Sequence, residues 1–123
     1  LIYDKLQELG YKPKVKTSGG KGYHVYADVI KQMTWGEAKS FAKSLAEELV
    51  NEFPEQYTIN LPKSKRIGKV FIDYLRNERG STTVAAFSTR AREEAPVSFP
   101  ITLNELGAIK PNEVNIRNWN ARY

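Results

Sequence analysis

The chain is organised around one stretch, Lys16-Thr17-Ser18-Gly19-Gly20-Lys21-Gly22-Tyr23-His24-Val25. We interpret it as a glycine-rich turn between two short strands. Its three glycines let the backbone approach a ligand closely, and successive backbone N–H groups in such a turn can form an anion-binding concavity. Ser18 adds a hydroxyl group, Lys16 and Lys21 add positive charge, and His24 is the only histidine. The stretch predicts a phosphate-binding turn; the alternative is a hairpin whose polar side chains face water.

The composition is typical of one globular domain with an anionic partner. The chain has 123 residues, of which 41% are hydrophobic, enough for a single core, so we treat residues 1–123 as a single domain. The formal net charge of +5 favours nucleic acid or nucleotides as partners. The absence of cysteine and the single histidine exclude a disulfide framework and a cysteine- or histidine-rich metal site. No apolar run approaches the ~18 residues of a membrane span, so we expect a soluble protein without a membrane partner.

The hydrophobic pattern predicts an α+β protein with one long helix. Thr34 and Glu37 fit a capping box at the start of that helix, which should end near Phe53. Residues 1–9 are expected to form the tail of a helix that stops at Gly10. The remaining predicted elements are strands over 14–17, 23–29, 57–61, 69–75 and 82–87, a helical turn over 102–106, and coil or a short edge strand at the end.

Asp73 is the residue on which a catalytic interpretation depends. The predicted strand over 69–75 is apolar on both faces, as a central strand should be. An ionised carboxylate there is costly unless it is paired or bound to a metal, and Mg²⁺ or Mn²⁺ would suit its oxygens. The alternative is an aspartate at a strand end that caps the following turn or pairs with Arg76.

Two groups of cations are candidates for contacts with phosphate. Arginine is preferred where phosphate is held in a fixed, bidentate geometry, and the first group consists of Arg76, Arg79, Arg90 and Arg92. The second group predicts a contact with the nucleic-acid backbone and consists of Lys63, Lys65, Arg66 and Lys69. For both groups the alternative is an ordinary solvated surface. A P-loop is excluded because Lys21 is followed by Gly22 rather than serine or threonine.

Together these segments resemble the polymerase domain of prokaryotic DNA ligase D, a member of the archaeo-eukaryotic primase superfamily. Residues 16–25 look like its second signature motif, and residues 71–77, Phe-Ile-Asp-Tyr-Leu-Arg-Asn, are similar to its third. Ser-Thr-Arg-Ala-Arg at 88–92, with Pro-Val-Ser at 96–98, also matches, and Ile-Arg-Asn at 116–118 resembles the closing segment. The resemblance covers nearly the whole chain, with the motifs in the correct order.

The resemblance implies part of a two-layer, RRM-like primase-polymerase core with a mixed or antiparallel sheet. It implies nucleotidyl transfer to DNA 3′ ends in non-homologous end joining, in the cytoplasm at the nucleoid, with NTP or dNTP as substrate and Mg²⁺ or Mn²⁺ as cofactor. Asp73 would be a catalytic, metal-binding carboxylate. The nucleotide and phosphate site would comprise Ser18, Gly19, Gly20, Lys21, His24, Arg76, Asn77 and Arg90. DNA would be contacted by Lys63, Lys65, Arg66 and Lys69.

The chain departs from the family pattern in one respect. The family's first motif, an Asp-x-Asp pair, is absent, since the only aspartates are Asp4, Asp28 and Asp73. We therefore expect the C-terminal portion of the domain, incomplete alone, with a strand edge that leads to self-association or to a need for the upstream half. Other expected partners are DNA ends, the ligase and end-binding proteins. The alternative is a non-catalytic basic nucleic-acid- or nucleotide-binding module; a phosphohydrolase or nuclease using Asp73 lacks a second suitably spaced carboxylate.

Overall fold

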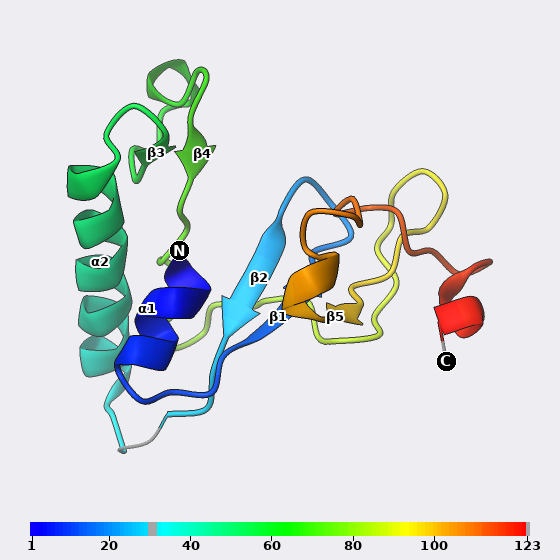
Figure 1. The fold of residues 1–123 in the computed structure, drawn as a ribbon, viewed down its shortest axis with the longest axis horizontal. Helices are drawn as coiled ribbons and strands as arrows, with labels where there is room; N and C mark the ends of the chain where they lie inside the picture. The colour runs from blue at the N-terminus through cyan, green and yellow to red at the C-terminus, as the bar shows by residue number, and fades with distance from the viewer. Residues whose placement is uncertain (30–31, 123) are drawn as a thin grey trace. The chain divides into compact units, whose positions relative to one another are not determined.

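The computed structural model describes residues 1–29 and 32–122, which form two compact units (Figure 1). Unit 1 consists of residues 1–9 and 29–83, and unit 2 consists of residues 10–28 and 84–123. The chain therefore passes from unit 1 to unit 2 after its first helix and contributes a hairpin there. It then returns to unit 1, and its last third belongs to unit 2. The glycine-rich turn belongs to unit 2, and Asp73 belongs to unit 1.

Unit 1 is built on two helices, α1 (Ile2–Glu8) and α2 (Trp35–Glu52), which lie against each other (Figure 1). Leu6 of α1 and Ala46 and Leu49 of α2 are buried. Two short strands, β3 (Tyr57–Thr58) and β4 (Val70–Phe71), pair in parallel. The crossover between them contains the 3₁₀ turn η1 (Lys63–Lys65).

The predicted capping box of the long helix is confirmed. The Thr34 hydroxyl accepts a hydrogen bond from the Glu37 backbone N–H at 3.1 Å, and the Glu37 carboxylate accepts one from the Thr34 N–H at 3.4 Å. These two bonds satisfy N–H groups that have no partner within the helix. At the other end the helix stops at Glu52, with Phe53 as its C-cap, just before Pro54.

Unit 2 contains a three-stranded antiparallel sheet in the order β2-β1-β5. The strands are β1 (Lys14–Thr17), β2 (Tyr23–Tyr26) and β5 (Pro100–Ile101), and β5 was not expected from the sequence. Two 3₁₀ turns follow β5, namely η2 (Leu103–Glu105) and η3 (Trp119–Arg122). The core of the unit is formed by Val15, Val97, Phe99, Ile101, Ile109 and Val114.

A buried seam of hydrogen bonds joins β1 to the segment before β5. Thr17 and Ser98 are both completely buried. The Ser98 hydroxyl donates to the Thr17 carbonyl at 2.8 Å, and the Thr17 hydroxyl donates to the Val97 carbonyl at 3.2 Å. The Phe99 N–H donates to the Thr17 hydroxyl at 2.9 Å, and the Thr17 N–H donates to the Phe99 carbonyl at 2.9 Å. The seam therefore fixes the residues before the glycine-rich turn against residues 97–99.

Several predicted strands are shorter in the structure or absent. The strands predicted over 23–29 and 57–61 are only β2 and β3. The strand predicted over 69–75 is only β4, because β3 is two residues long and gives it no further backbone to pair with. The strand predicted over 82–87 does not form; this segment runs past β1, where Val84 accepts a side-chain bond from Lys16. The end of the chain forms η3, with one isolated bridge between Asn115 and Pro96. β-Propensity alone does not make a strand where no partner backbone is available.

The predicted α+β class is confirmed by this mixture of helices, an antiparallel sheet and a parallel pair. No helix among residues 1–29 and 32–122 is long and apolar enough to span a membrane.

Replacement of Thr34 tests the capping box of α2. Thr34→Ala removes the side-chain acceptor for the Glu37 N–H, so the free energy of unfolding should fall by about 1 kcal/mol. Thr34→Ser keeps that acceptor, so its free energy of unfolding should stay close to that of the parent protein. The measurement is urea denaturation followed by circular dichroism. Equal destabilisation by the two substitutions would contradict the role given to the cap.

Candidate nucleotide and phosphate site

The glycine-rich turn, residues 18–22, is closed by its own hydrogen bonds. The Ser18 N–H donates to the Gly22 carbonyl at 3.0 Å, and the Ser18 hydroxyl oxygen accepts from the N–H groups of Gly20 at 3.0 Å and Gly22 at 3.2 Å. The Gly19 N–H donates to the Pro111 carbonyl at 3.0 Å. The backbone N–H groups therefore converge as expected, but on the Ser18 hydroxyl. A phosphate oxygen that reached them would have to share or replace that hydroxyl.

Arg90 lies directly on this turn. Its guanidinium Nη1 donates to the Ser18 carbonyl at 2.8 Å, although the two residues are 72 positions apart. A guanidinium carries five N–H donors, and this bond uses one of them. A Cβ built on Gly19 would lie 2.7 Å from Arg90 Cγ, so the close packing of arginine and turn requires a glycine there. The structure thus brings Ser18, Gly19 and Arg90 together.

Arg92 also belongs to this arrangement. Its guanidinium carbon lies 3.4 Å from where a Cβ on Gly20 would be. The sequence groups Arg92 with the candidate arginines but does not place it in the nucleotide and phosphate site. The signal in the sequence is that Arg92 lies only two residues after Arg90 in the same segment.

The segment that carries both arginines is held in a strained hairpin. Thr89 forms an antiparallel bridge with Val97, and the Arg90 N–H donates to the Pro96 carbonyl at 2.7 Å. Three non-glycine residues around it have positive φ: Phe87 at 67°, Glu94 at 65° and Ala95 at 46°. Such conformations cost energy and persist only where the surrounding structure imposes them. The two guanidinium groups are therefore presented from a defined backbone.

The sequence suggests that Lys16 adds an exposed positive charge to the turn, but the structure shows that it does not. It is buried, its Nζ donates to the Val84 carbonyl at 2.5 Å, and it lies 5.2 Å from the centre of the Tyr26 ring. Burial lowers the pKa of Lys16. In the sheet register Lys16 faces His24, which is half-buried on β2. Lys21 is exposed at the tip of the turn, so it remains the turn's solvent-facing cation.

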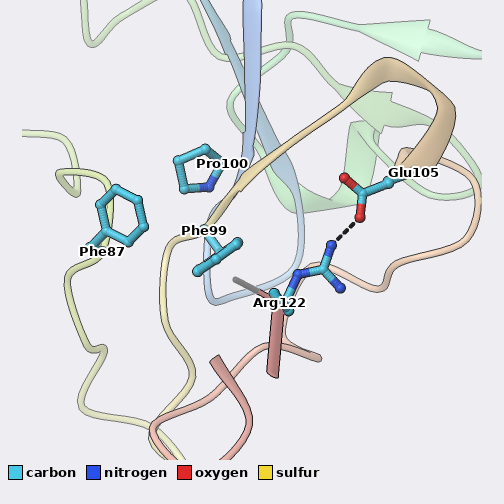
Figure 2. Close-up of a pocket in the computed structure, with 5 residues that line it drawn as sticks. All are labelled: Phe87, Phe99, Pro100, Glu105 and Arg122. Carbon is cyan, nitrogen blue, oxygen red and sulfur yellow. Dashed lines mark hydrogen bonds and ion pairs between the residues drawn. The ribbon is translucent and has the colours of Figure 1, made fainter. Parts of the chain in front are cut away.

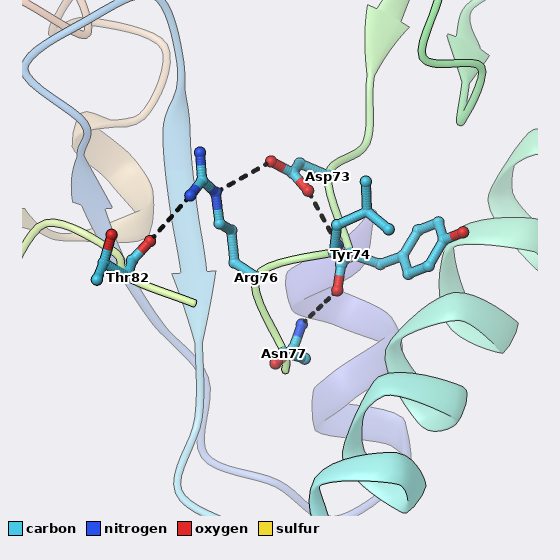
Figure 3. A network of polar contacts seen from close by, with 6 residues as sticks. Asp73, Tyr74, Arg76, Asn77 and Thr82 are labelled. Atoms are coloured by element: carbon cyan, nitrogen blue, oxygen red, sulfur yellow. Dashed lines mark hydrogen bonds and ion pairs between the residues drawn. The ribbon is translucent and has the colours of Figure 1, made fainter. Parts of the chain in front are cut away.

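Asp73 is not the buried strand carboxylate that the sequence suggested. It follows β4, and its side chain is 40% exposed (Figure 3). One oxygen, Oδ1, accepts from the Leu75 N–H at 2.9 Å, and the other, Oδ2, lies 3.7 Å from Nε of Arg76. Asp73 thus caps a turn and pairs with Arg76, and it lies outside a strand because β4 is too short to contain it.

Arg76 and Asn77 complete the same polar turn in unit 1. Arg76 Nη1 donates to the Thr82 carbonyl at 3.2 Å, and Asn77 Nδ2 donates to the Tyr74 carbonyl at 3.0 Å (Figure 3). Within the described part of the chain, no three His, Asp or Glu side chains gather in a way that could hold a metal ion. These residues by themselves do not fit a two-metal centre, because Asp73 offers a single carboxylate with a cation beside it.

The predicted DNA-contacting cations lie in the β3–β4 crossover of unit 1. Lys63, Lys65 and Lys69 are exposed. Arg66 is half-buried; its guanidinium lies 4.3 Å from the centre of the Phe71 ring and donates to the Leu61 carbonyl. The three lysines present their charge to solvent, whereas Arg66 also holds the loop together.

A pair of glycine substitutions tests the packing of arginine against the turn. Gly19→Ala places a Cβ at φ +71°, 2.7 Å from Arg90 Cγ. The backbone strain alone costs about 1–2 kcal/mol, so the midpoint of urea unfolding should fall. Gly22→Ala is the matched control, since no atom lies within 4 Å of its Cβ position. Unfolding midpoints that coincide for the two variants would show that this packing is wrong.

Comparison with known proteins agrees with the resemblance seen in the sequence. Residues 1–123 match the sequence model of the LigD primase-polymerase domain. The multifunctional non-homologous end joining protein LigD of Pseudomonas aeruginosa is 43% identical over 113 residues, which are 91% of this chain and 14% of that protein. The bifunctional non-homologous end joining protein LigD of Bacillus subtilis is 31% identical over 102 residues, 82% of this chain and 17% of that protein.

A solved structure agrees as well. The polymerase domain of Mycobacterium tuberculosis Ligase D, in complex with DNA, is 32% identical and superposes with a TM-score of 0.91 over 98% of this chain and 42% of that one. The chain therefore spans less than a fifth of these curated relatives and less than half of the solved domain. Its fold is that of part of this polymerase domain, and the chain belongs to the LigD primase-polymerase domain family.

Proposed function

We propose that the chain supplies the triphosphate-binding part of a nucleotidyltransferase that adds nucleotides to DNA 3′ ends during end joining at the nucleoid. The observation that carries the proposal is the contact of Arg90 with the Ser18 carbonyl, with Arg92 beside Gly20. This contact collects guanidinium groups around a turn that already gathers N–H donors. Such groups hold phosphate oxygens with charge-assisted hydrogen bonds.

The charge balance at the turn supports an anionic ligand. Arg90, Arg92 and Lys21 carry positive charge, and within the described residues no carboxylate lies at ion-pair distance from any of them. A cluster of cations without counter-charges attracts a polyphosphate. NTP or dNTP is the ligand of this class that a nucleotidyltransferase would use. His24 follows the turn and would extend the contacts along β2.

DNA is the second proposed ligand. The solved relative was determined in complex with DNA, and in this chain Lys63, Lys65 and Lys69 are exposed within one short crossover. Lysine contacts of this kind bind backbone phosphates without reading the sequence of bases. The proposed partners therefore include DNA ends, with the ligase and end-binding proteins as further partners of the same repair process.

The proposed use of Mg²⁺ or Mn²⁺ depends on Asp73, whose carboxylate can supply oxygen ligands of the kind these ions prefer. The described residues contain no group of three or more His, Asp or Glu side chains that could hold a metal ion, so we attribute triphosphate binding to the cations. The same observation favours a second candidate, a non-catalytic nucleotide-binding module. Manganese-dependent primer extension separates the two.

The triphosphate site is tested by replacing Arg90. Charge-assisted contacts contribute roughly 1.5–3 kcal/mol each, so Arg90→Ala should weaken binding of a nucleoside triphosphate by about tenfold or more. Isothermal calorimetry measures this, and Arg117→Ala, an exposed arginine of the same unit, is the control. Melting curves verify that each variant is folded. If nucleoside and triphosphate bind equally well to the parent chain, the site does not hold phosphate.

DNA binding is tested through its dependence on salt. Neutralising Lys63, Lys65 or Lys69 should each reduce the slope of log affinity against log salt by about one unit, because each phosphate contact releases a counterion. Arg66→Ala should also perturb the loop, since its ring contact is lost. Lys43→Gln is the control, as this lysine is paired with Glu47 on α2 at 3.8 Å. If the slope of log affinity against log salt is unchanged in every loop variant, the loop is an ordinary solvated surface.

A further inference from the structure

A hollow of about 290 Å³ lies in unit 2, and none of the residues assigned to triphosphate or DNA lines it (Figure 2). It is lined by Phe87, Phe99, Pro100, Glu105 and Arg122. These residues come from the segment before the arginine hairpin, from the start of β5, and from the turns η2 and η3. The volume is just below the usual range for small-molecule sites, roughly 300–1,000 Å³, so it suits at most a single ring system.

Two aromatic rings shape this hollow. Their centroids are 5.4 Å apart and their planes are nearly perpendicular, at 82°. Phe99 is 6% exposed and belongs to the core, whereas Phe87 is 51% exposed. Phe87 also has a φ of 67°, a conformation that is an outlier for a bulky residue. Burial does not offset that strain, because half of the side chain faces solvent. The Phe87 N–H donates to the Ser98 carbonyl at 2.6 Å and holds this conformation, so the exposed face of the ring is carried by a fixed backbone.

The opposite side of the hollow is formed by an ion pair. The Arg122 guanidinium lies 5.5 Å from the centre of the Phe99 ring and pairs with the Glu105 carboxylate (Figure 2). The Thr102 N–H donates to the same carboxylate at 3.0 Å. This bond is the main reason that the pKa of Glu105 is lowered. Hydrogen bonds from the side chains of Thr102 and Arg122 and the charge of Arg122 also lower the pKa, whereas desolvation raises it. The ion pair balances the charge of Arg122, so the hollow suits an uncharged ring better than a phosphate.

We propose that this hollow binds one unpaired nucleobase. The base would stack on the Phe87 ring and on the flat Arg122 guanidinium, as aromatic and arginine side chains do with unstacked bases. The Glu105 carboxylate, at the polar wall, would accept a hydrogen bond from an amino or imino group of the base. The base can come from single-stranded DNA or from a free nucleoside. Only the first source depends on the DNA binding proposed above.

The test compares two ligands that differ only in their bases. Fluorescence anisotropy measures binding of the 123-residue chain to a short oligodeoxythymidylate and to an abasic oligomer with the same number of phosphates. Stacking on one aromatic residue should make the base-bearing oligomer bind about tenfold more tightly. Phe87→Leu should abolish most of this preference and leave the affinity for the abasic oligomer unchanged, whereas Phe87→Tyr should retain the preference. Trp35→Leu is the control, since Trp35 is an exposed aromatic residue of unit 1.

Thymidine, which has no phosphate, identifies the source of the base. Competition by thymidine that Phe87→Leu removes would support a site for a free nucleoside. A base preference without such competition would support a site for a base within DNA. Equal affinity for the two oligomers, with no binding of thymidine, overturns the inference and leaves the Arg90 triphosphate site standing. A preference for bases that survives Phe87→Leu in a folded variant overturns it too. A chain that binds neither oligomer but binds thymidine through Phe87 would overturn the proposed DNA binding instead.

Discussion

The hydrogen bonds between Thr17 and residues 97–99 are the constraint on which unit 2 depends. Thr17 and Ser98 are completely buried, and each hydroxyl donates to a backbone carbonyl of the other segment. A buried polar group left without its partner costs about 1–3 kcal/mol, so the two segments have one favourable alignment. Since Ser18 follows Thr17 and Arg90 lies on the hairpin that pairs with residues 96–98, this alignment also sets the contact between turn and arginine.

Several polar groups of the glycine-rich stretch are used by the fold itself. Lys16 and Thr17 are buried and bond to backbone carbonyls, and the Ser18 hydroxyl closes the turn. What remains at the surface of the turn is positive charge, supplied by Lys21 from within and by two arginines from the hairpin. Part of a stretch with the composition of an anion site therefore serves the fold, and the proposed phosphate binding depends on a segment that is distant in the sequence.

In unit 1, Asp73 lies in a different environment from the one that its sequence neighbours suggest. The carboxylate of Asp73 is partly exposed, caps a local turn and lies beside Arg76. Asp73 is therefore not the buried, unpaired carboxylate that the sequence suggested. The apolar pattern around Asp73 had suggested a central strand, but β4 is paired over two residues only. A strand extends only as far as its partner's backbone does.

The sequence by itself determined the features whose interactions are local: the capping box at Thr34, the glycine stop at Gly10, and the turn at residues 18–22. The order and spacing of the motifs also determined the family. Only the tertiary structure decided that β5 pairs with β1, that Arg90 reaches the Ser18 carbonyl, and that Asp73 is exposed. The physical reason is that caps and turns are satisfied within a few residues, whereas pairing and burial depend on which distant segment supplies the missing hydrogen bonds.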